Sequence, residues 1–215
     1  PDKFIPIAER TKHIHEIGLL MLDEVCFAIK ALNGWGFSTV KFNLNMSAVQ
    51  LQNDGVVELF AERFAFHNID PGRIVIEITE STLQSAKARD VLTKIKALGV
   101  IVSIDDFGTG FSCISELADE TYDAIKIDRS LLPGFPLQNK REKRRALIIE
   151  NVVSMCVKLG MPCTLEGLET IEQVSFAKEI GAKAMQGYYF TKPLNLVGLM
   201  EYLQAEHSSP LVHIS

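Results

Sequence analysis

Apolar residues along this chain follow two alternating patterns. Short β-branched runs, such as Ile74-Val75-Ile76 and Val100-Ile101-Val102, are separated by longer segments in which apolar residues recur with the helical period. The runs are continuous, as in parallel strands that are covered on both faces. The pattern predicts strands at residues 39–45, 73–79, 99–105, 123–128, 162–166 and 182–186. It predicts helices at residues 13–32, 54–67, 86–98, 112–119, 141–159, 170–180 and 195–205.

This alternation makes about six βα units, so the expected fold class is α/β with a parallel sheet. A (β/α) barrel and an open doubly wound sheet both fit the pattern. Gly99, Gly160 and Gly181 each follow a predicted helix, at the position where a left-handed C-cap is expected.

Polar residues of the kind that bind ligands follow nearly every predicted strand. A barrel gathers the carboxyl ends of all its strands around one mouth, so these side chains would converge in a barrel. The residues are Asn45, Glu77, Glu80, Asp105, Asp106, Lys126, Asp128, Glu166, Glu169 and Gln186.

Four or more carboxylates at one mouth repel each other unless cations neutralise them, and their oxygens suit hard divalent ions such as Mg²⁺ or Mn²⁺. Two ions about 3.5–4 Å apart would activate water and stabilise the leaving oxygen of a phosphoryl displacement. The adjacent pair Asp105-Asp106 is suited to bridge them. A single acidic residue after a strand can instead cap the next helix, as at Glu80. The same chemistry at five strand ends favours the metal site.

Composition and charge narrow the classes of function. The length of 215 residues favours one domain, residues 1–206, with a tail at residues 207–215. Lys+Arg 22 against Asp+Glu 27 gives a charge of -5, so no overall basic surface attracts DNA, RNA or anionic lipid. The basic run at residues 140–145 is expected to be a solvated turn, with a partner-docking surface as the alternative.

The apolar stretches are far shorter than the roughly 20 residues that span a bilayer, and no leader opens the chain. We therefore expect a cytoplasmic protein; a membrane anchor elsewhere in a longer protein stays open. Cys26, Cys113, Cys156 and Cys163 form no C-x-x-C pair, so we expect reduced, mostly buried thiols.

Seven motifs, in order along residues 4 to 205, closely resemble those of bacterial EAL domains. They are Phe4-Ile5-Pro6-Ile7-Ala8-Glu9, Asn45-Met46-Ser47 with Gln50-Leu51, Glu77-Ile78-Thr79-Glu80-Ser81, Asp105-Asp106-Phe107-Gly108-Thr109-Gly110, Lys126-Ile127-Asp128-Arg129-Ser130, Glu166-Gly167-Leu168-Glu169 and Gln186-Gly187-Tyr188-Tyr189-Phe190.

The resemblance implies a modified TIM barrel, with one antiparallel strand, that hydrolyses cyclic di-GMP to linear pGpG with Mg²⁺ or Mn²⁺, whereas Ca²⁺ preserves binding and blocks turnover. It implies a homodimer formed through elements near the Gly108 loop, and a longer protein with sensory or GGDEF-like domains. The loop at residues 108–110 is a candidate gate over bound ligand.

Residue roles carried over from the family follow the motifs. Asn45, Glu77 and Asp105 resemble ligands of a first metal, and Asp105 with Asp106 resembles a second set. Lys126 would hold the attacking water or a phosphate oxygen, and Glu166 would act as base or second-metal ligand. Glu80 would anchor the glycine loop, while Asp128, Glu169 and Gln186 would complete the ligand-binding mouth.

One family feature is not found in this sequence. EAL domains carry Glu-Ala-Leu, and an Arg two positions later, on a strand before the Phe-Ile-Pro segment, and nothing before Phe4 supplies them. We expect a longer protein to carry this first strand upstream. Two other functions stay open: a cyclic di-GMP receptor without turnover, and a metal-dependent barrel acting on another phosphate ester.

Overall fold

The structure is a computed structural model, and it describes residues 1, 3–109, 117 and 121–208. All six predicted strands are present, each within a few residues of its predicted bounds. They are hydrogen-bonded to each other in chain order, and the pairs β1/β2, β4/β5 and β5/β6 are parallel. The strands are β1 Phe42–Asn45, β2 Ile74–Thr79, β3 Ile101–Phe107, β4 Ala124–Ile127, β5 Cys163–Leu165 and β6 Ala184–Met185.

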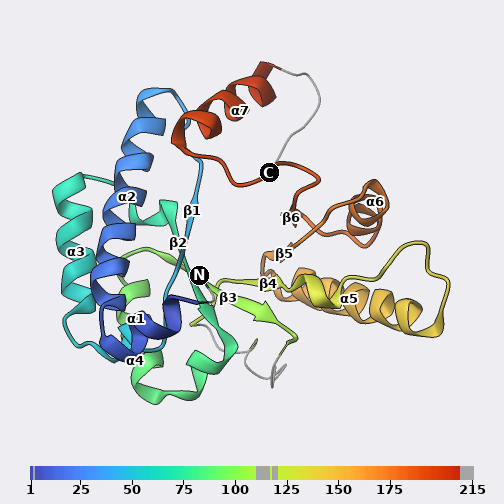
Figure 1. The fold of residues 1–215 in the computed structure, drawn as a ribbon, viewed down its shortest axis with the longest axis horizontal. Coiled ribbons are helices and arrows are strands. Elements are labelled where there is room, and N and C mark those ends of the chain that lie inside the picture. Colours follow the sequence, from blue (N-terminus) through green and yellow to red (C-terminus); the bar gives the residue numbers. More distant parts are fainter. Residues whose placement is uncertain (2, 110–116, 118–120, 209–215) are drawn as a thin grey trace. The chain divides into compact units, whose positions relative to one another are not determined.

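Helices follow the strands as the periodicity predicted (Figure 1). They are α2 Ile14–Gly34, α3 Val56–His67, α4 Ala86–Lys96, α5 Lys140–Leu159, α6 Ile171–Glu179 and α7 Leu196–Ser208. The sequence patterns missed α1 Ile5–Thr11, which is short and carries a proline in its first turn. Proline is tolerated there because that turn's N–H groups have no partner within the helix. The helix predicted at residues 112–119 lies outside the described residues, apart from residue 117.

The described residues form two compact units: residues 1–104 with 117 and 121–123, and residues 105–109 with 124–208. In the first unit, β1 pairs with β2 in a register that sets Leu44 beside Ile76 and Asn45 beside Glu77. Leu44 and Ile76 are buried. Because successive side chains point to opposite faces of a strand, Asn45 and Glu77 lie on the other face of this pair.

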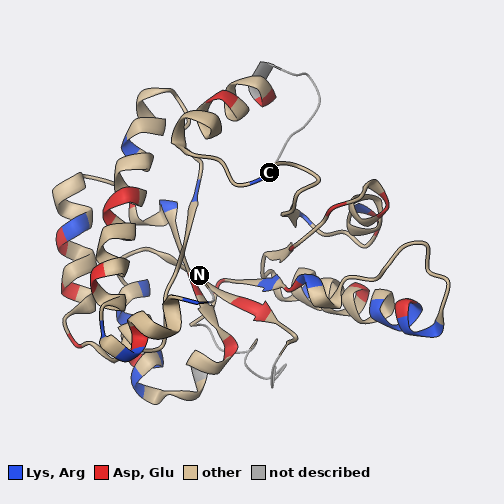
Figure 2. Cartoon of the chain, in the orientation of Figure 1, with Lys and Arg blue, Asp and Glu red and all other residues tan. Residues whose placement is uncertain are grey.

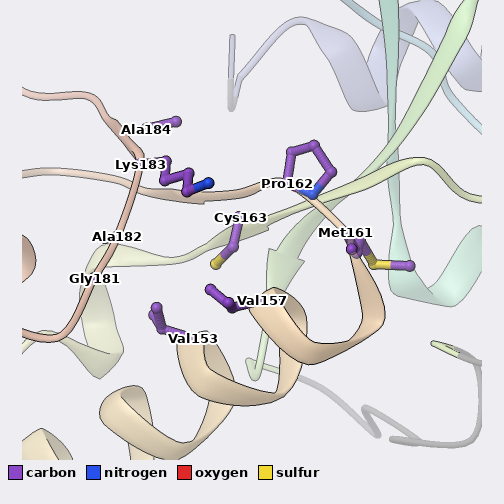
Figure 3. A pocket seen from close by; sticks show the side chains of 10 residues that line it. Val153, Val157, Met161, Pro162, Cys163, Gly181, Ala182, Lys183 and Ala184 are labelled. Atoms are coloured by element: carbon purple, nitrogen blue, oxygen red, sulfur yellow. The ribbon is translucent and has the colours of Figure 1, made fainter. Parts of the chain in front are cut away.

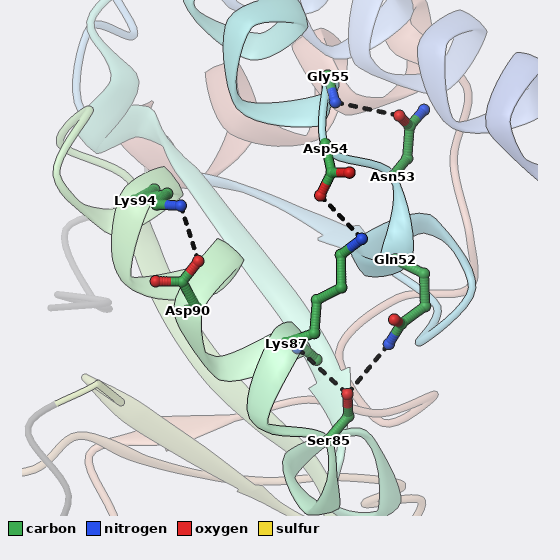
Figure 4. A network of polar contacts seen from close by, with 9 residues as sticks. Gln52, Asn53, Asp54, Gly55, Ser85, Lys87, Asp90 and Lys94 are labelled. Atoms are coloured by element: carbon green, nitrogen blue, oxygen red, sulfur yellow. Dashed lines mark hydrogen bonds and ion pairs between the residues drawn. The ribbon is translucent and has the colours of Figure 1, made fainter.

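Helix α4 of the first unit begins in a network of polar contacts (Figure 4). The Ser85 hydroxyl accepts hydrogen bonds from the Ala88 backbone N–H at 3.3 Å and from the Gln52 amide at 3.0 Å. Lys87 in the first turn reaches Asp54, with 2.8 Å between Nζ and Oδ1. The Ser85 cap satisfies a donor that the helix leaves unpaired, so it sets where α4 starts.

In the second unit, α5 packs against β5 through one apolar stripe. Ala146, Ile149, Val153 and Cys156 are buried at helical spacing along α5. The helix begins at Asn139, whose side chain accepts from the Glu142 N–H at 2.9 Å, and ends at Gly160.

The predicted left-handed glycines are confirmed. Gly99, Gly160 and Gly181 have φ angles of 104°, 68° and 83°, which glycine adopts without steric cost.

Beside α5 lies an apolar cavity of about 340 Å³ (Figure 3). It is lined by residues of α5, β5 and the segment into β6, including Val153, Val157, Met161 and Cys163. Lys183 is its one ionisable lining side chain apart from the thiol. The cavity therefore lacks the groups that phosphoryl chemistry needs.

Cys26, Cys156 and Cys163 are buried free thiols, as predicted, and Cys113 lies outside the described residues. Among the described helices, none is long and apolar enough to cross a membrane.

Buried Arg73 ties the segment before β1 to the start of β2. Its side chain is 6% exposed. It donates to the backbone oxygens of Val40, Ser38 and Phe37, and to the Asn33 side chain at 2.8 Å. Burial lowers the pKa of the guanidinium, and the paired oxygens offset the cost of burying its charge.

We expect Arg73→Ala to lower the free energy of unfolding by about 3 kcal/mol, because several buried carbonyl oxygens lose their donor. Urea denaturation followed by circular dichroism measures this. Exposed Arg10 provides the control, and Arg10→Ala should change stability by less than about 0.5 kcal/mol. Equal effects of the two substitutions would contradict the assigned role of Arg73.

Candidate metal-binding and catalytic site

Three carboxylates meet at the ends of β3 and β5 in the second unit. One carboxylate oxygen from each of Asp105, Asp106 and Glu166 lies within 4.8 Å of the others. Asp105 and Asp106 lie near the end of strand β3, and Glu166 directly follows β5. The Glu166 N–H donates to the Ile127 carbonyl at 3.1 Å, which holds its backbone against β4. The structure thus brings these three predicted residues together, and their roles stay predictions.

The backbone of Asp106 explains how two adjacent carboxylates reach one cluster. In a regular strand, neighbouring side chains point to opposite faces. Asp106 has a φ of 54°, in the left-handed region, which interrupts that alternation. Asp is among the few residues that tolerate this region. Its carbonyl accepts from the Thr109 N–H at 3.1 Å and the Thr109 hydroxyl at 2.9 Å, and these bonds close the turn.

Lys126, on β4, is the cation of the cluster. Its side chain is nearly buried, and its Nζ lies 2.5 Å from Glu166 Oε1 and 3.3 Å from Asp105 Oδ1. Three carboxylates around one ammonium leave an excess of negative charge. Burial raises the pKa of the Asp106 carboxyl, the carboxylates of Asp105 and Asp128 raise it further, and Lys126 opposes the rise.

The donor set of this cluster fits a hard divalent cation. Asp105, Asp106 and Glu166 offer partly buried carboxylate oxygens, which Mg²⁺ and Mn²⁺ prefer, and a cation would relieve their mutual repulsion. A bound divalent ion would supply an activated water and polarise a phosphoryl oxygen. Asp105, Asp106 and Glu166 are the residues that would hold this ion.

A cavity of about 240 Å³ adjoins the cluster and shares Glu166 with it. Three residues predicted for the ligand-binding mouth, Asp128, Glu169 and Gln186, line this cavity together with Arg129 and Tyr188.

Asp128 also caps the short helix η5 Arg129–Leu131, because its carboxylate accepts from the Ser130 N–H at 2.8 Å. Burial works against ionisation of Asp128, but hydrogen bonds from Ser130 and Arg129 outweigh it and lower its pKa. Asp128 thus adds a stable negative charge beside the cluster.

Gly187 lets the chain turn tightly at the edge of the same cavity. A Cβ at this position would collide with the backbone of Leu168. The close approach carries two hydrogen bonds, from the Leu168 N–H to the Gln186 carbonyl at 3.1 Å and from the Tyr189 N–H to the Leu168 carbonyl at 3.0 Å. Glycine is required here for space, and it places Gln186 beside Glu169 at the cavity.

The first unit holds the other predicted residues. Asn45 and Glu77 are register partners on β1 and β2, and Glu77 is only 3% exposed. Glu80 is half-buried in the first turn of the short helix η3 Glu80–Gln84. Its proposed partner, the glycine loop, lies outside the described residues from residue 110 onward, so the anchoring role of Glu80 stays a prediction.

Asn43 contacts a predicted site residue, and the sequence reasoning did not single it out. Its side-chain amide donates to Glu77 Oε1 at 2.5 Å. The pattern Asn43-Leu44-Asn45 contained the signal, since residues two apart on a strand share a face. A hydrogen-bond donor on one carboxylate oxygen fixes the orientation of the other.

The structure combines an α/β fold with an acidic cluster that could hold a metal ion, and the chain belongs to the EAL domain family, whose model matches residues 1–193.

Its relatives include two Pseudomonas aeruginosa proteins. The bifunctional diguanylate cyclase/cyclic di-GMP phosphodiesterase MucR is 33% identical over 90% of this chain, and the cyclic di-GMP phosphodiesterase NbdA is 30% identical over 95%. The chain spans only 28% and 26% of their respective lengths. The solved PaMucR phosphodiesterase in complex with c-di-GMP superimposes with a TM-score of 0.84 at 30% identity, covering 93% of this chain and 80% of that one.

We expect Asn43→Ala to weaken Mn²⁺ binding about tenfold, because Glu77 loses the donor that orients it. Isothermal titration with Mn²⁺, without substrate, measures the change. Asn151→Ala, at an exposed asparagine on α5, is the matched control and should leave the affinity unchanged. Loss of affinity in Glu77→Ala but not in Asn43→Ala would contradict the role of Asn43.

Proposed function

We propose that this chain hydrolyses cyclic di-GMP to linear pGpG, as the phosphodiesterase part of a longer signalling protein. The observation that carries the proposal is Lys126, held between Asp105 and Glu166 beside a cavity of about 240 Å³. Membership of the EAL family supports it, as do the names of MucR and NbdA and the c-di-GMP bound in PaMucR.

In the proposed reaction, Glu166 takes the proton of the attacking water. Lys126 forms an ion pair with Glu166 and would hydrogen-bond the water or a non-bridging phosphate oxygen. The water oxygen forms a bond to phosphorus, the bond from phosphorus to the 3′ oxygen breaks, and that oxygen leaves with a proton. Each turnover consumes one water and opens one of the two phosphodiester bonds.

The proposed metal ions are Mg²⁺ or Mn²⁺. Asp105, Asp106 and Glu166 would hold one ion, and Asn45 and Glu77, together with Asp105, would hold the other ion that the family implies. Glu169 and Gln186 are proposed to contact the nucleotide, because both line the cavity beside Glu166.

A homodimer and further sensory or GGDEF-like domains complete the proposal. The short share of MucR that this chain spans, and the cyclase named in MucR, support a multidomain protein. The three described cysteines are buried free thiols, which suits the reducing cytoplasm.

We expect Glu166→Gln to lower kcat for pGpG formation at least about a hundredfold, because the base is lost, while cyclic di-GMP binding is kept. Chromatography of cyclic di-GMP incubated with Mn²⁺ measures turnover. The assay includes a version extended upstream, and Glu172→Gln, at an exposed glutamate of α6, is the control. Binding without product in both versions, unaffected by Glu166→Gln or metal removal, would identify a receptor and refute the enzyme.

Replacing Mn²⁺ by Ca²⁺ should preserve cyclic di-GMP binding and abolish turnover, because Ca²⁺ takes more ligands in a looser geometry. Fluorescence titration with a labelled cyclic di-GMP and the same chromatographic assay measure the two effects. Undiminished turnover in Ca²⁺ would contradict a two-metal mechanism.

A further inference from the structure

The solvent-facing side of α5 combines cations with exposed aliphatic side chains. Opposite the buried stripe of this helix lie six exposed residues, here called the basic face: Lys140, Arg141, Lys143, Arg144, Leu147 and Ile148. Leu147 is 60% exposed and Ile148 is 52% exposed. Figure 2 shows the basic residues gathered at the start of α5. The basic run was expected to be a solvated turn; it is exposed at these four cations, but it forms the start of a helix and not a turn.

The four cations of the basic face do not stabilise helix α5. They lie in its first turns, where the partial positive charge of the helix N-terminus repels cations. The acidic residue of this segment, Glu142, accepts from the Gly134 N–H and pairs with Arg145 at 3.8 Å. Within the described part of the chain, the four cations of the basic face form no ion pair with a carboxylate. Their charge is therefore available to an external anion.

Leu147 and Ile148 determine which anion fits best. They lie within two turns of Lys140 and Arg144 on the same side of α5. A partner with a flat surface can therefore contact the cations and the aliphatic side chains at the same time. An interfacial helix on a bilayer has this composition, with cations at the phosphate level and aliphatic side chains at the acyl boundary. Nucleic acid would use the cations and leave both aliphatic side chains against a polar backbone.

We propose that the basic face of α5 docks on membranes that contain anionic phospholipid. The chain as a whole carries a charge of -5, which a negative surface repels, so the local charge of +4 on this face would orient the molecule. Docking is peripheral: the cations contact headgroup phosphates, and Leu147 and Ile148 enter the boundary with the acyl chains. The proposal is independent of the phosphodiesterase activity.

Co-sedimentation with lipid vesicles tests the docking. The unaltered protein should bind vesicles of phosphatidylcholine with about one third phosphatidylglycerol, and should bind pure phosphatidylcholine at least tenfold more weakly. Binding should fall steeply as salt is raised, because salt screens the attraction between charges. Equal binding to both vesicles, or binding that salt does not weaken, would overturn the proposal without any variant.

Variants with matched changes in charge test whether vesicle binding depends on the basic face. Each cation near an anionic membrane contributes about fivefold to binding, so replacing all four by Gln should weaken it at least about a hundredfold. Replacing Leu147 and Ile148 by Gln should weaken it at least about fivefold. The control replaces four exposed lysines elsewhere by Gln, with the same change in net charge, and should keep most of the binding. These are Lys12, Lys30, Lys41 and Lys178.

Other outcomes point to other partners and refute membrane docking. A control variant that loses as much binding as the basic-face variant would show a general charge effect. Retained vesicle binding by the fourfold basic-face variant would refute the location. Absence of vesicle binding, with capture of a polyglutamate peptide or of duplex DNA by the same face, would assign α5 to an acidic protein or a nucleic acid. Unchanged circular dichroism and an unchanged midpoint of urea denaturation verify that each variant is folded.

Discussion

The balance of charge around Lys126 is the constraint on which the second unit depends. One nearly buried ammonium contacts Asp105 and Glu166, and Asp106 is close enough to complete a cluster of three carboxylates. Burying the ammonium alone would be unfavourable, and so would gathering the carboxylates without it. The ammonium leaves part of the negative charge uncompensated. The remaining negative charge makes the cluster suited to a divalent cation, and Lys126 holds the Glu166 carboxylate in place by an ion pair.

The local structure around this cluster serves to bring its charges together. Parallel pairing of β4 with β5 sets Lys126 beside Thr164, one residue from the end of β5, so Glu166 follows within reach. The left-handed backbone of Asp106 turns a second carboxylate toward the first at a modest steric cost. Gly187, which has no room for a Cβ against Leu168, brings Gln186 to the neighbouring cavity. Both the regular pairing of β4 with β5 and the two local interruptions, at Asp106 and Gly187, therefore position side chains of the site.

Helix α5 shows how one element can meet two separate demands. Its buried stripe and the caps at Asn139 and Gly160 satisfy the fold, and they place no requirement on its other side. The cations and aliphatic side chains of that side are unfavourable or neutral for the helix itself. A surface of this kind indicates a partner, and combined with the phosphodiesterase proposal it would bring cyclic di-GMP hydrolysis to a membrane surface.

The sequence by itself determined the α/β class, the six strands, the capping glycines and the chemistry expected at the strand ends, because apolar periodicity and glycine placement are local signals. It also carried the family resemblance, since the motifs are contiguous. Tertiary structure decided the rest. The Asn43 bond to Glu77 depends on the register of two strands 34 residues apart, and the meeting of Asp106 with Glu166 depends on one positive φ angle. Neither is encoded in local periodicity, because both arise only when distant segments have been brought to fixed positions by burial of the core.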